Sequence, residues 1–344
     1  MKPRQKILSL LLLCALSSAA QTGNTYAFLD LPAASRNAAL GGQAITIYDN
    51  NLTLAFDNPA HLTLATHNDL TFSYANWFKD VNIASAVYGR NLDDKNYFAT
   101  GFRYVDYGKF QGATETDQLT GTFTAKDMIA EAIYTRWLSP HWSCGVATKV
   151  IYSVYEKYQS VGMAFDIGFS YHNIEKGVTA ALVCRDAGFQ FKGYYSIDGR
   201  QRYESLPVNL MLGVSYRLSK IPVRLSFTYH NLQHWDLGYS TSSAVTDNLK
   251  QESSARQGVD MFFRHTIWSV EVIPTNYLYF VVAYSHRRHQ DMAIASKRSA
   301  AGFSFGAGFS VKQFSVGFSI LPYQAGNLGF NIDLSIDLAS FGIK

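Results

Sequence analysis

Apolar and small or polar residues alternate along three consecutive segments near the C-terminus. Between Ala301 and Val311 the odd-numbered positions are apolar, and the even-numbered ones are Gly or Ser. The alternation restarts at Phe314 and again at Leu328. A period of two residues is typical of a β-strand, whose successive side chains point to opposite faces. Repeated hairpins with aromatic residues on one face and Gly or Ser on the other favour strands between lipid and a water-filled interior.

The same alternation predicts about 14 strands after residue 66. Segment 124–138 alternates poorly, because Asp127 and Glu131 share a parity with Ile129 and Ile133. That parity predicts a bulge or a different start for this strand. The predicted strands are 67–76, 81–90, 96–106, 124–138, 142–153, 158–172, 177–186, 206–218, 222–231, 262–273, 277–286, 298–309, 313–320 and 328–338.

Loop lengths provide an independent test of a membrane barrel. Connections after even-numbered strands are short, whereas three after odd-numbered strands are long, at 107–123, 187–205 and 232–261, and a fourth, 287–297, is intermediate. Short periplasmic turns that alternate with longer surface loops are typical of outer-membrane barrels. No segment after the N-terminal leader has the roughly 18 apolar residues of a membrane helix. The fold class is therefore an all-β transmembrane barrel of about 14 antiparallel strands, closed because open sheet edges do not occur in hydrocarbon.

The two faces of these strands predict two environments. The aromatic and branched parity is expected to face lipid, and the lumen to hold Gly, Ser, Ala and scattered charge. The lumen charges would be Arg103, Lys149, Asp166, Arg217, Arg224, Glu271, Asp333 and Asp337. An interfacial aromatic girdle is expected near the short turns. Its members would be Trp137, Trp142, Tyr171 and Tyr216.

The N-terminal 66 residues do not follow this pattern. Residues 1–20 resemble a secretory signal peptide, with cations before an apolar core of 7–16 and small residues for cleavage near Ala20. Residues 21–66 contain an Ala/Leu run that predicts a short helix ended by Gly41-Gly42, and then a turn at Asn58-Pro59. Because side chains alone do not fill so wide a barrel, we expect 21–66 to fold into the lumen as a plug and 67–344 to form the wall.

Charge and cysteine content exclude several classes of protein. Removal of Lys2, Arg4 and Lys6 with the leader lowers the formal charge from +4 to +1, and no basic run remains to neutralise a phosphate backbone, so no nucleic-acid partner is expected. Cys144 and Cys184 lie in predicted strands. Their pairing is not readable from sequence, and two small apolar side chains are favoured over a disulfide.

Residues 39–42, followed by Asp49 and then Asn58-Pro59-Ala60, together resemble the N-terminal signature of the PorV/PorQ family of outer-membrane proteins, which are similar in fold to FadL-type transporters with an N-terminal hatch. Further matches to this family lie at 183–188, at Leu206-Pro207 and at 229–237. The resemblance implies an outer-membrane component of the type IX secretion system, with PorZ-, PorU- and PorV-like proteins and lipopolysaccharide as partners. The plug motif that carries it consists of Ala39, Leu40, Gly41, Gly42, Asp49, Asn58, Pro59 and Ala60.

Candidate chemistry is sparse. The cluster His286-Arg287-Arg288-His289 could bind a metal or a phosphate, but a solvated surface loop is favoured. If the cluster functions, Arg287 and Arg288 would contact an anion such as lipopolysaccharide phosphate. His230, His234 and Trp235 are expected at the membrane interface. No nucleophile elbow, zinc motif or phosphate loop occurs, so we expect no catalytic residues, no cofactor and no metal.

Three hypotheses for function follow. The first is a scaffold that anchors the cell-surface attachment complex of type IX secretion, with no small-molecule substrate. The alternative is a FadL-like channel for hydrophobic or small solutes, which predicts an apolar pocket between plug and wall and a lateral opening or kinked strand. The third is a general porin, against which a plugged lumen argues.

Overall fold

The computed structural model describes residues 25–114, 116, 118–237, 254–292, 300–324 and 327–342. The predicted signal peptide, residues 1–20, lies outside this range. Fourteen antiparallel strands form one closed barrel, in which the first strand pairs with the last. A short hairpin of β8 (Ser196–Ile197) and β9 (Arg200–Gln201) stands apart from the wall. The barrel strands are β1 (Asp69–Phe78), β2 (Val81–Asn91), β3 (Asn96–Ala113), β4 (Leu119–Ser139), β5 (Trp142–Tyr155), β6 (Tyr158–Asn173), β7 (Val178–Lys192), β10 (Asn209–Arg217), β11 (Val223–Tyr229), β12 (Thr266–Thr275), β13 (Leu278–Ser285), β14 (Phe303–Val311), β15 (Phe314–Gln324) and β16 (Asn327–Asp337).

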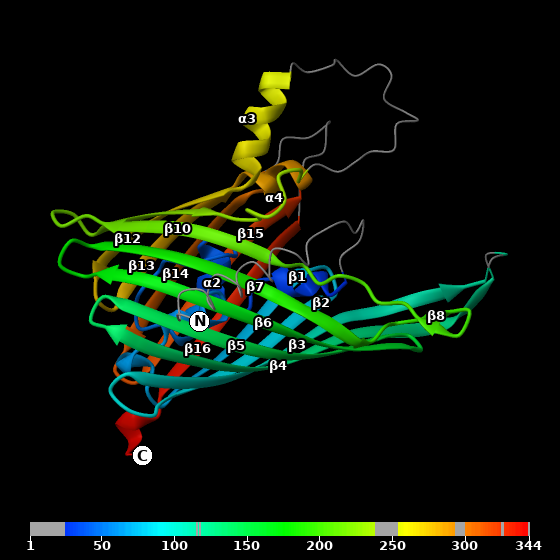
Figure 1. The fold of residues 1–344 in the computed structure, drawn as a ribbon, viewed down its shortest axis with the longest axis horizontal. Coiled ribbons are helices and arrows are strands. Elements are labelled where there is room, and N and C mark those ends of the chain that lie inside the picture. The colour runs from blue at the N-terminus through cyan, green and yellow to red at the C-terminus, as the bar shows by residue number, and fades with distance from the viewer. Residues whose placement is uncertain are drawn as a thin grey trace, which may run out of the picture.

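Each of the 14 predicted strands corresponds to one strand of this barrel. Two predicted loops contain strand instead, because β3 continues to Ala113 before β4 starts at Leu119, and β7 continues to Lys192. Beyond the last pairs with their outer neighbours, β3 and β4 pair only with each other, so their hairpin projects from the barrel (Figure 1). We call this side the long-loop end, and the side that carries the turns near 174–177, 218–222 and 276–277 the short-turn end.

The outer face is apolar, as the alternation predicts. Phe305, Phe318 and Ile332 are exposed at mid-strand, whereas Ser304, Ser319 and Asn331 between them are buried. Surrounding lipid gives such a face an apolar environment. Trp142, Tyr171 and Tyr216 lie on the outer face near short turns. Trp137 does not join them, because its indole points inward and donates to the Leu62 carbonyl at 3.1 Å.

The inner face is less polar than the sequence analysis predicts. Ile83, Ile129, Ile133 and Ile151 all point inward and are buried. The β4 register against β5 runs without a shift from Ala125 to Trp137, so no bulge accounts for Asp127 and Glu131. The other predicted possibility, a different start, is confirmed, because β4 begins at Leu119. Apolar and acidic residues share one parity there because the lumen contains packed protein as well as charge.

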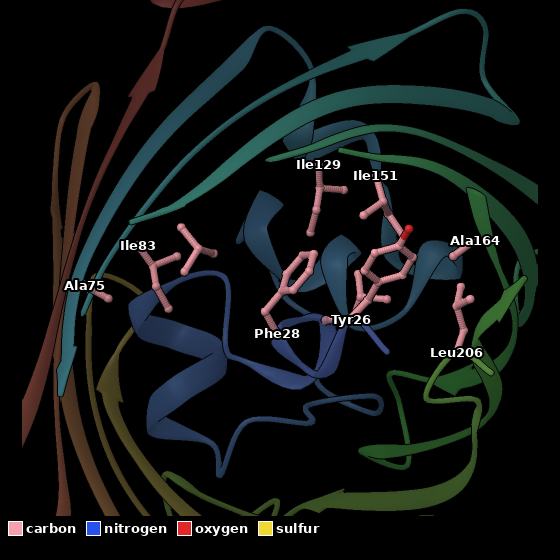
Figure 2. Packing of buried hydrophobic residues seen from close by; sticks show 10 residues of the cluster. Tyr26, Phe28, Ala75, Ile83, Ile129, Ile151, Ala164 and Leu206 are labelled. Atoms are coloured by element: carbon pink, nitrogen blue, oxygen red, sulfur yellow. The ribbon is translucent and has the colours of Figure 1, made fainter. Parts of the chain in front are cut away.

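Residues 25–66 supply that packed protein, and we call them the plug. They form the short helices η1 (Ala27–Asp30), α2 (Ser35–Ala39), η2 (Leu52–Phe56), η3 (Pro59–His61) and η4 (Leu64–Thr66). Tyr26 and Phe28 pack against Ile129, Ile151 and Ala164 of the wall (Figure 2). Phe56 and Leu62 form a second cluster with β2, β3, β4 and β5. The plug therefore packs against the wall through buried apolar clusters to which both contribute.

Two of the predicted lumen charges lie elsewhere. Arg217 and Asp337 are the last residues of their strands and are exposed at the short-turn end. The other six are buried inside the barrel. Cys144 and Cys184 are both thiols. Among the described helices, none is long and apolar enough to span a membrane.

Candidate functional site

Charged side chains join the plug to the wall near the short-turn end. Arg36 of α2 forms ion pairs with Asp49 at 2.9 Å and with Glu271 of β12 at 2.5 Å. Arg224 of β11 pairs with the same two carboxylates. The Arg36 guanidinium also lies 3.7 Å above the Tyr279 ring. Two arginines and two carboxylates balance one another, as buried charges require.

Asp49 is the carboxylate that the plug contributes to this network. Burial alone raises its pKa, but Arg36 and Arg224 outweigh that effect and hold the pKa of Asp49 at about 2. Solvent reaches 29% of its side chain, which moderates the cost of burial. Asp49 therefore stays ionised and keeps the network neutral at any ordinary pH.

A second charged cluster lies on β5, β6 and β7. Lys149 Nζ lies 2.7 Å from both Asp166 and Asp186, and all three side chains are buried. Arg185 connects this cluster to the plug, because it pairs with Asp57 at 3.1 Å and donates to the Leu29 carbonyl. The plug is thus held by ion pairs on two sides of the lumen.

Strand glycines make room for the Asn58-Pro59-Ala60 turn. A Cβ atom on Gly145 would lie 2.0 Å from the Pro59 carbonyl oxygen, and one on Gly168 would lie 2.2 Å from Asn58 Oδ1. The Asn58 amide donates to Ile45 O and to Ser170 Oγ, and Ser143 donates to Ala60 O. These contacts explain why the turn follows the backbone of β5 and β6 so closely.

Helix α2 of the plug is fixed at both ends. Asp333 of β16 accepts hydrogen bonds from the backbone N–H and the hydroxyl of Ser35. At the other end Gly41 has a φ of 97°, and a Cβ there would lie 2.5 Å from Ile267. The predicted helix stop at Gly41-Gly42 is present, since α2 ends at Ala39 and the N–H of Gly42 bonds to Asn37 O.

A pocket of about 330 Å³ lies between plug and wall at the long-loop end, and we call it the long-loop pocket. The plug contributes Asp30 and the backbone turn at Gly41-Gly42-Gln43. The wall contributes aromatic residues, of which Trp77 and Tyr323 pack edge to face with ring centroids 5.6 Å apart. The remaining polar lining residues are His230, Ser285, Arg287, Arg288 and Asp291.

A larger pocket of about 560 Å³ lies at the short-turn end, and we call it the short-turn pocket. Three short turns surround it, and Tyr48 of the plug and Arg224 of the network line it. Its other charged lining residues are Glu175, Lys176, Arg217 and Lys220. Each end of the barrel thus has a pocket with charged side chains in its lining, and the plug with its ion pairs lies between the two pockets.

Strand β7 is irregular next to the second charged cluster. Its register against β6 shifts between Phe165 and Ile167, and Asp186 has a φ of 57°. Its pairing with β10 stops at Arg185. The part of β7 beyond Asp186 therefore lacks a β10 partner, as the channel hypothesis expects of a kinked strand.

The sequence motifs lie in different places. All residues of the plug motif are in the lumen. Arg287 and Arg288 belong to helix α4 (His286–Asp291), a helix where a loop was predicted. Arg288 Nη2 donates to Gly302 O, Phe303 O and Ser304 Oγ, so it points into the barrel mouth. Anion contact by this pair stays a prediction. His230, expected at the interface, is buried in the long-loop pocket instead.

Sequence reasoning missed Asp30, Gln43, Trp77 and Tyr323 of this pocket. Trp77 carried a usable signal, because it shares the lumen parity of Ala75 at the end of β1. Tyr323 carried none, since it lies beyond the predicted end of its strand. Among the described residues, no three His, Cys, Asp or Glu side chains are grouped so that they could hold a metal ion.

Comparison with known proteins defines the fold. No family model and no curated protein matches the sequence. Solved structures do match. The Pseudomonas putida toluene transporter TodX is 12% identical, with a TM-score of 0.52 over 92% of this chain and 98% of that one. The Ralstonia pickettii toluene transporter TbuX is 11% identical, with a TM-score of 0.51 over 91% and 98%. A Pseudomonas aeruginosa FadL homologue is 11% identical, with a TM-score of 0.50 over 89% and 98%.

These structures are outer-membrane barrels of the FadL type, and this chain has their fold. At such low identity the likeness extends to fold alone. No family model or curated protein connects the chain to the PorV/PorQ family, so that finer resemblance still depends on the sequence motifs.

Proposed function

We propose that this protein is an outer-membrane channel for small solutes, in which the plug governs passage. The observation that carries the proposal is a pocket at each end of a membrane barrel, with a charge-anchored plug between them. The irregular β7 adds support. So do the names of the structural neighbours, which describe toluene transporters and a FadL homologue.

Ion pairs are a suitable anchor for a plug that must yield. Each buried pair is costly to desolvate and is stabilising only while its partners stay in place. A local rearrangement that separates Arg36 from Glu271 would weaken the whole network. Passage would then follow plug movement in the lumen and would need no change in the wall.

Solute flux into proteoliposomes tests this proposal. The wild-type chain should admit small solutes, and Arg36→Met should admit them faster because it removes the Arg36–Glu271 pair between plug and wall. Arg200→Met is the matched control, since Arg200 is exposed on the short β8–β9 hairpin, which stands apart from the wall, and lines neither pocket. If the wild type and Arg36→Met both remain closed to glycerol, glucuronate and toluene, while deletion of residues 25–66 opens the barrel, the proposal is wrong.

A second candidate is the surface scaffold of type IX secretion that the PorV/PorQ resemblance implies. The observation that favours it is the projecting β3–β4 hairpin, in which Phe110 and Phe123 stack with ring centroids 5.4 Å apart. PorZ-, PorU- and PorV-like proteins and lipopolysaccharide would be its partners. Gene deletion tests it: proteins with the type IX C-terminal signal should spill into the medium or stall in the periplasm. Normal surface attachment combined with lower solute uptake would favour the channel.

A further inference from the structure

Arg288 is a half-buried cation that lines the long-loop pocket and has no carboxylate partner among the described residues. Its hydrogen bonds go to two carbonyls and one hydroxyl, and its Nε has no partner within the described part of the chain. Neighbouring Arg287 differs, because it pairs with Asp291 at 3.5 Å. The charge of Arg288 is therefore met only by neutral acceptors, and an anion bound in the pocket would supply the missing counter-charge.

Two acceptors beside it also lack donors among the described residues. His230 is 2% exposed, and its Nε2 has no partner. Its Nδ1 lies 2.7 Å from Asn231 Oδ1, an acceptor also approached by Arg287, so Nδ1 carries the proton and Nε2 presents a lone pair. Gln43 Oε1 is buried and unpartnered as well. A buried acceptor without a donor destabilises the empty pocket, and a bound donor would remove that cost.

The aromatic side of the pocket adds a third requirement. Trp77 and Tyr323 line it next to these polar groups. An apolar wall opposite unsatisfied donors and acceptors suits a ring that has C–H faces and hydroxyl edges. A hydrocarbon would leave all three polar groups unsatisfied, and a simple inorganic anion would leave the two acceptors unsatisfied.

We propose that the long-loop pocket binds a small hydroxylated anion of the sugar-acid or sugar-phosphate class. The anionic group pairs with Arg288, hydroxyl groups donate to His230 Nε2 and Gln43 Oε1, and the ring lies against Trp77 and Tyr323. This inference rests on the proposed function in treating the pocket as the entry site of the channel. Binding itself does not require passage.

Calorimetric titration of the full chain in detergent micelles tests the ligand class with glucuronate, glucose and toluene as probes. Glucuronate should bind about 10-fold or more tighter than glucose, because a charged hydrogen bond is worth more than a neutral one. Arg288→Gln should remove that preference. Equal affinity for glucose and glucuronate, or heat from toluene alone, overturns the proposal.

Gln43→Leu separates ligand binding from folding. It removes a buried unpartnered acceptor, so the melting temperature should not fall, yet affinity for glucuronate should drop about 3- to 10-fold with the lost hydrogen bond. Gln313→Leu in the 312–313 turn is the matched control and should change neither. If Gln43→Leu leaves the affinity intact, the placement of the hydroxyl group is wrong.

Two further comparisons distinguish the sources of the ligand and the fate of the channel proposal. Displacement of glucuronate by lipopolysaccharide identifies a membrane headgroup as the source, and retention of glucuronate identifies a free solute. Binding without flux leaves this inference standing and overturns the channel. Flux of toluene without glucuronate binding leaves the channel proposal standing and overturns the inference about the pocket.

Discussion

Arg36 of the plug and Glu271 of the wall form an ion pair at 2.5 Å, with side-chain exposures of 2% and 0%. Removing one partner of such a pair costs about 3–5 kcal/mol, because the other charge stays buried alone. Arg36→Met should therefore lower the free energy of unfolding by about that amount. Chemical denaturation in detergent or lipid measures it.

The double variant Arg36→Met with Glu271→Gln tests the same pair differently. It should be less destabilised than the sum of the two single variants, since neither charge is then left unpaired. The partly exposed pair of Arg264 and Asp260 serves as the control, for which a coupling energy of about 0–1 kcal/mol is expected. Additive single effects at Arg36 and Glu271 would contradict the ion-pair account.

Asp49 makes plug anchoring sensitive to acid. Its pKa in the folded chain is about 2, below the ordinary value of 3.8, so its contribution is complete above about pH 4 and is lost as pH falls through 2. The melting-temperature gap between wild type and Asp49→Asn should be wide at pH 6 and closed at pH 2. Asp198→Asn, in the exposed β8–β9 turn, should show no gap at either pH.

The closest approach between plug and wall predicts a steric effect. Gly145→Ala places a methyl group 2.0 Å from the Pro59 carbonyl, and overpacking of this kind costs about 1–3 kcal/mol. Limited proteolysis should then cut the plug of this variant faster than that of wild type. Gly258→Ala on helix α3 (Ser254–Arg264), where nothing lies within 4 Å, should not change the cutting rate.

The cost of an arginine on the lipid-facing surface should depend on its depth in the membrane. Phe318→Arg at mid-strand should destabilise the barrel by about 2–4 kcal/mol, and Val311→Arg at the rim by about 0–1 kcal/mol. Phe318 and Val311 are both exposed in the structure. Unfolding titrations in lipid vesicles compare the two variants. Equal costs would mean that the apolar band is misplaced.

The number of strands and the side of the wall on which each side chain lies could be predicted, because both follow from an alternation with a period of two residues. In β14, β15 and β16 the outer residues must be apolar and the inner ones small, whatever lies in the lumen. The inner face of β4 mixes apolar and acidic residues because they meet different partners: Ile133 packs in the cluster around Phe56 of the plug, whereas Asp127 accepts from Tyr107 of β3. Such a pattern depends on contacts far away in sequence, which a local period cannot reveal.

The candidate site was harder to predict for the same reason. The motif Asn58-Pro59-Ala60 could be singled out, but its partners Ser143 and Ser170 are ordinary strand serines in the sequence. Arg36 was noted only as part of a motif, and its partner Glu271 lies 235 positions later. Arg287 and Arg288 looked equivalent, yet one faces Asp291 while the other turns into the barrel mouth.

The hydrogen bonds from Ser35 to Asp333 join residues 298 positions apart. Asp333 lies on β16, the strand that pairs with β1 to close the wall. The plug helix therefore obtains its N-terminal partner only when the last strand of the chain has arrived. A chain that stops before β16 would therefore lose two things together, the strand that closes the wall and the acceptor that holds the N-terminus of α2.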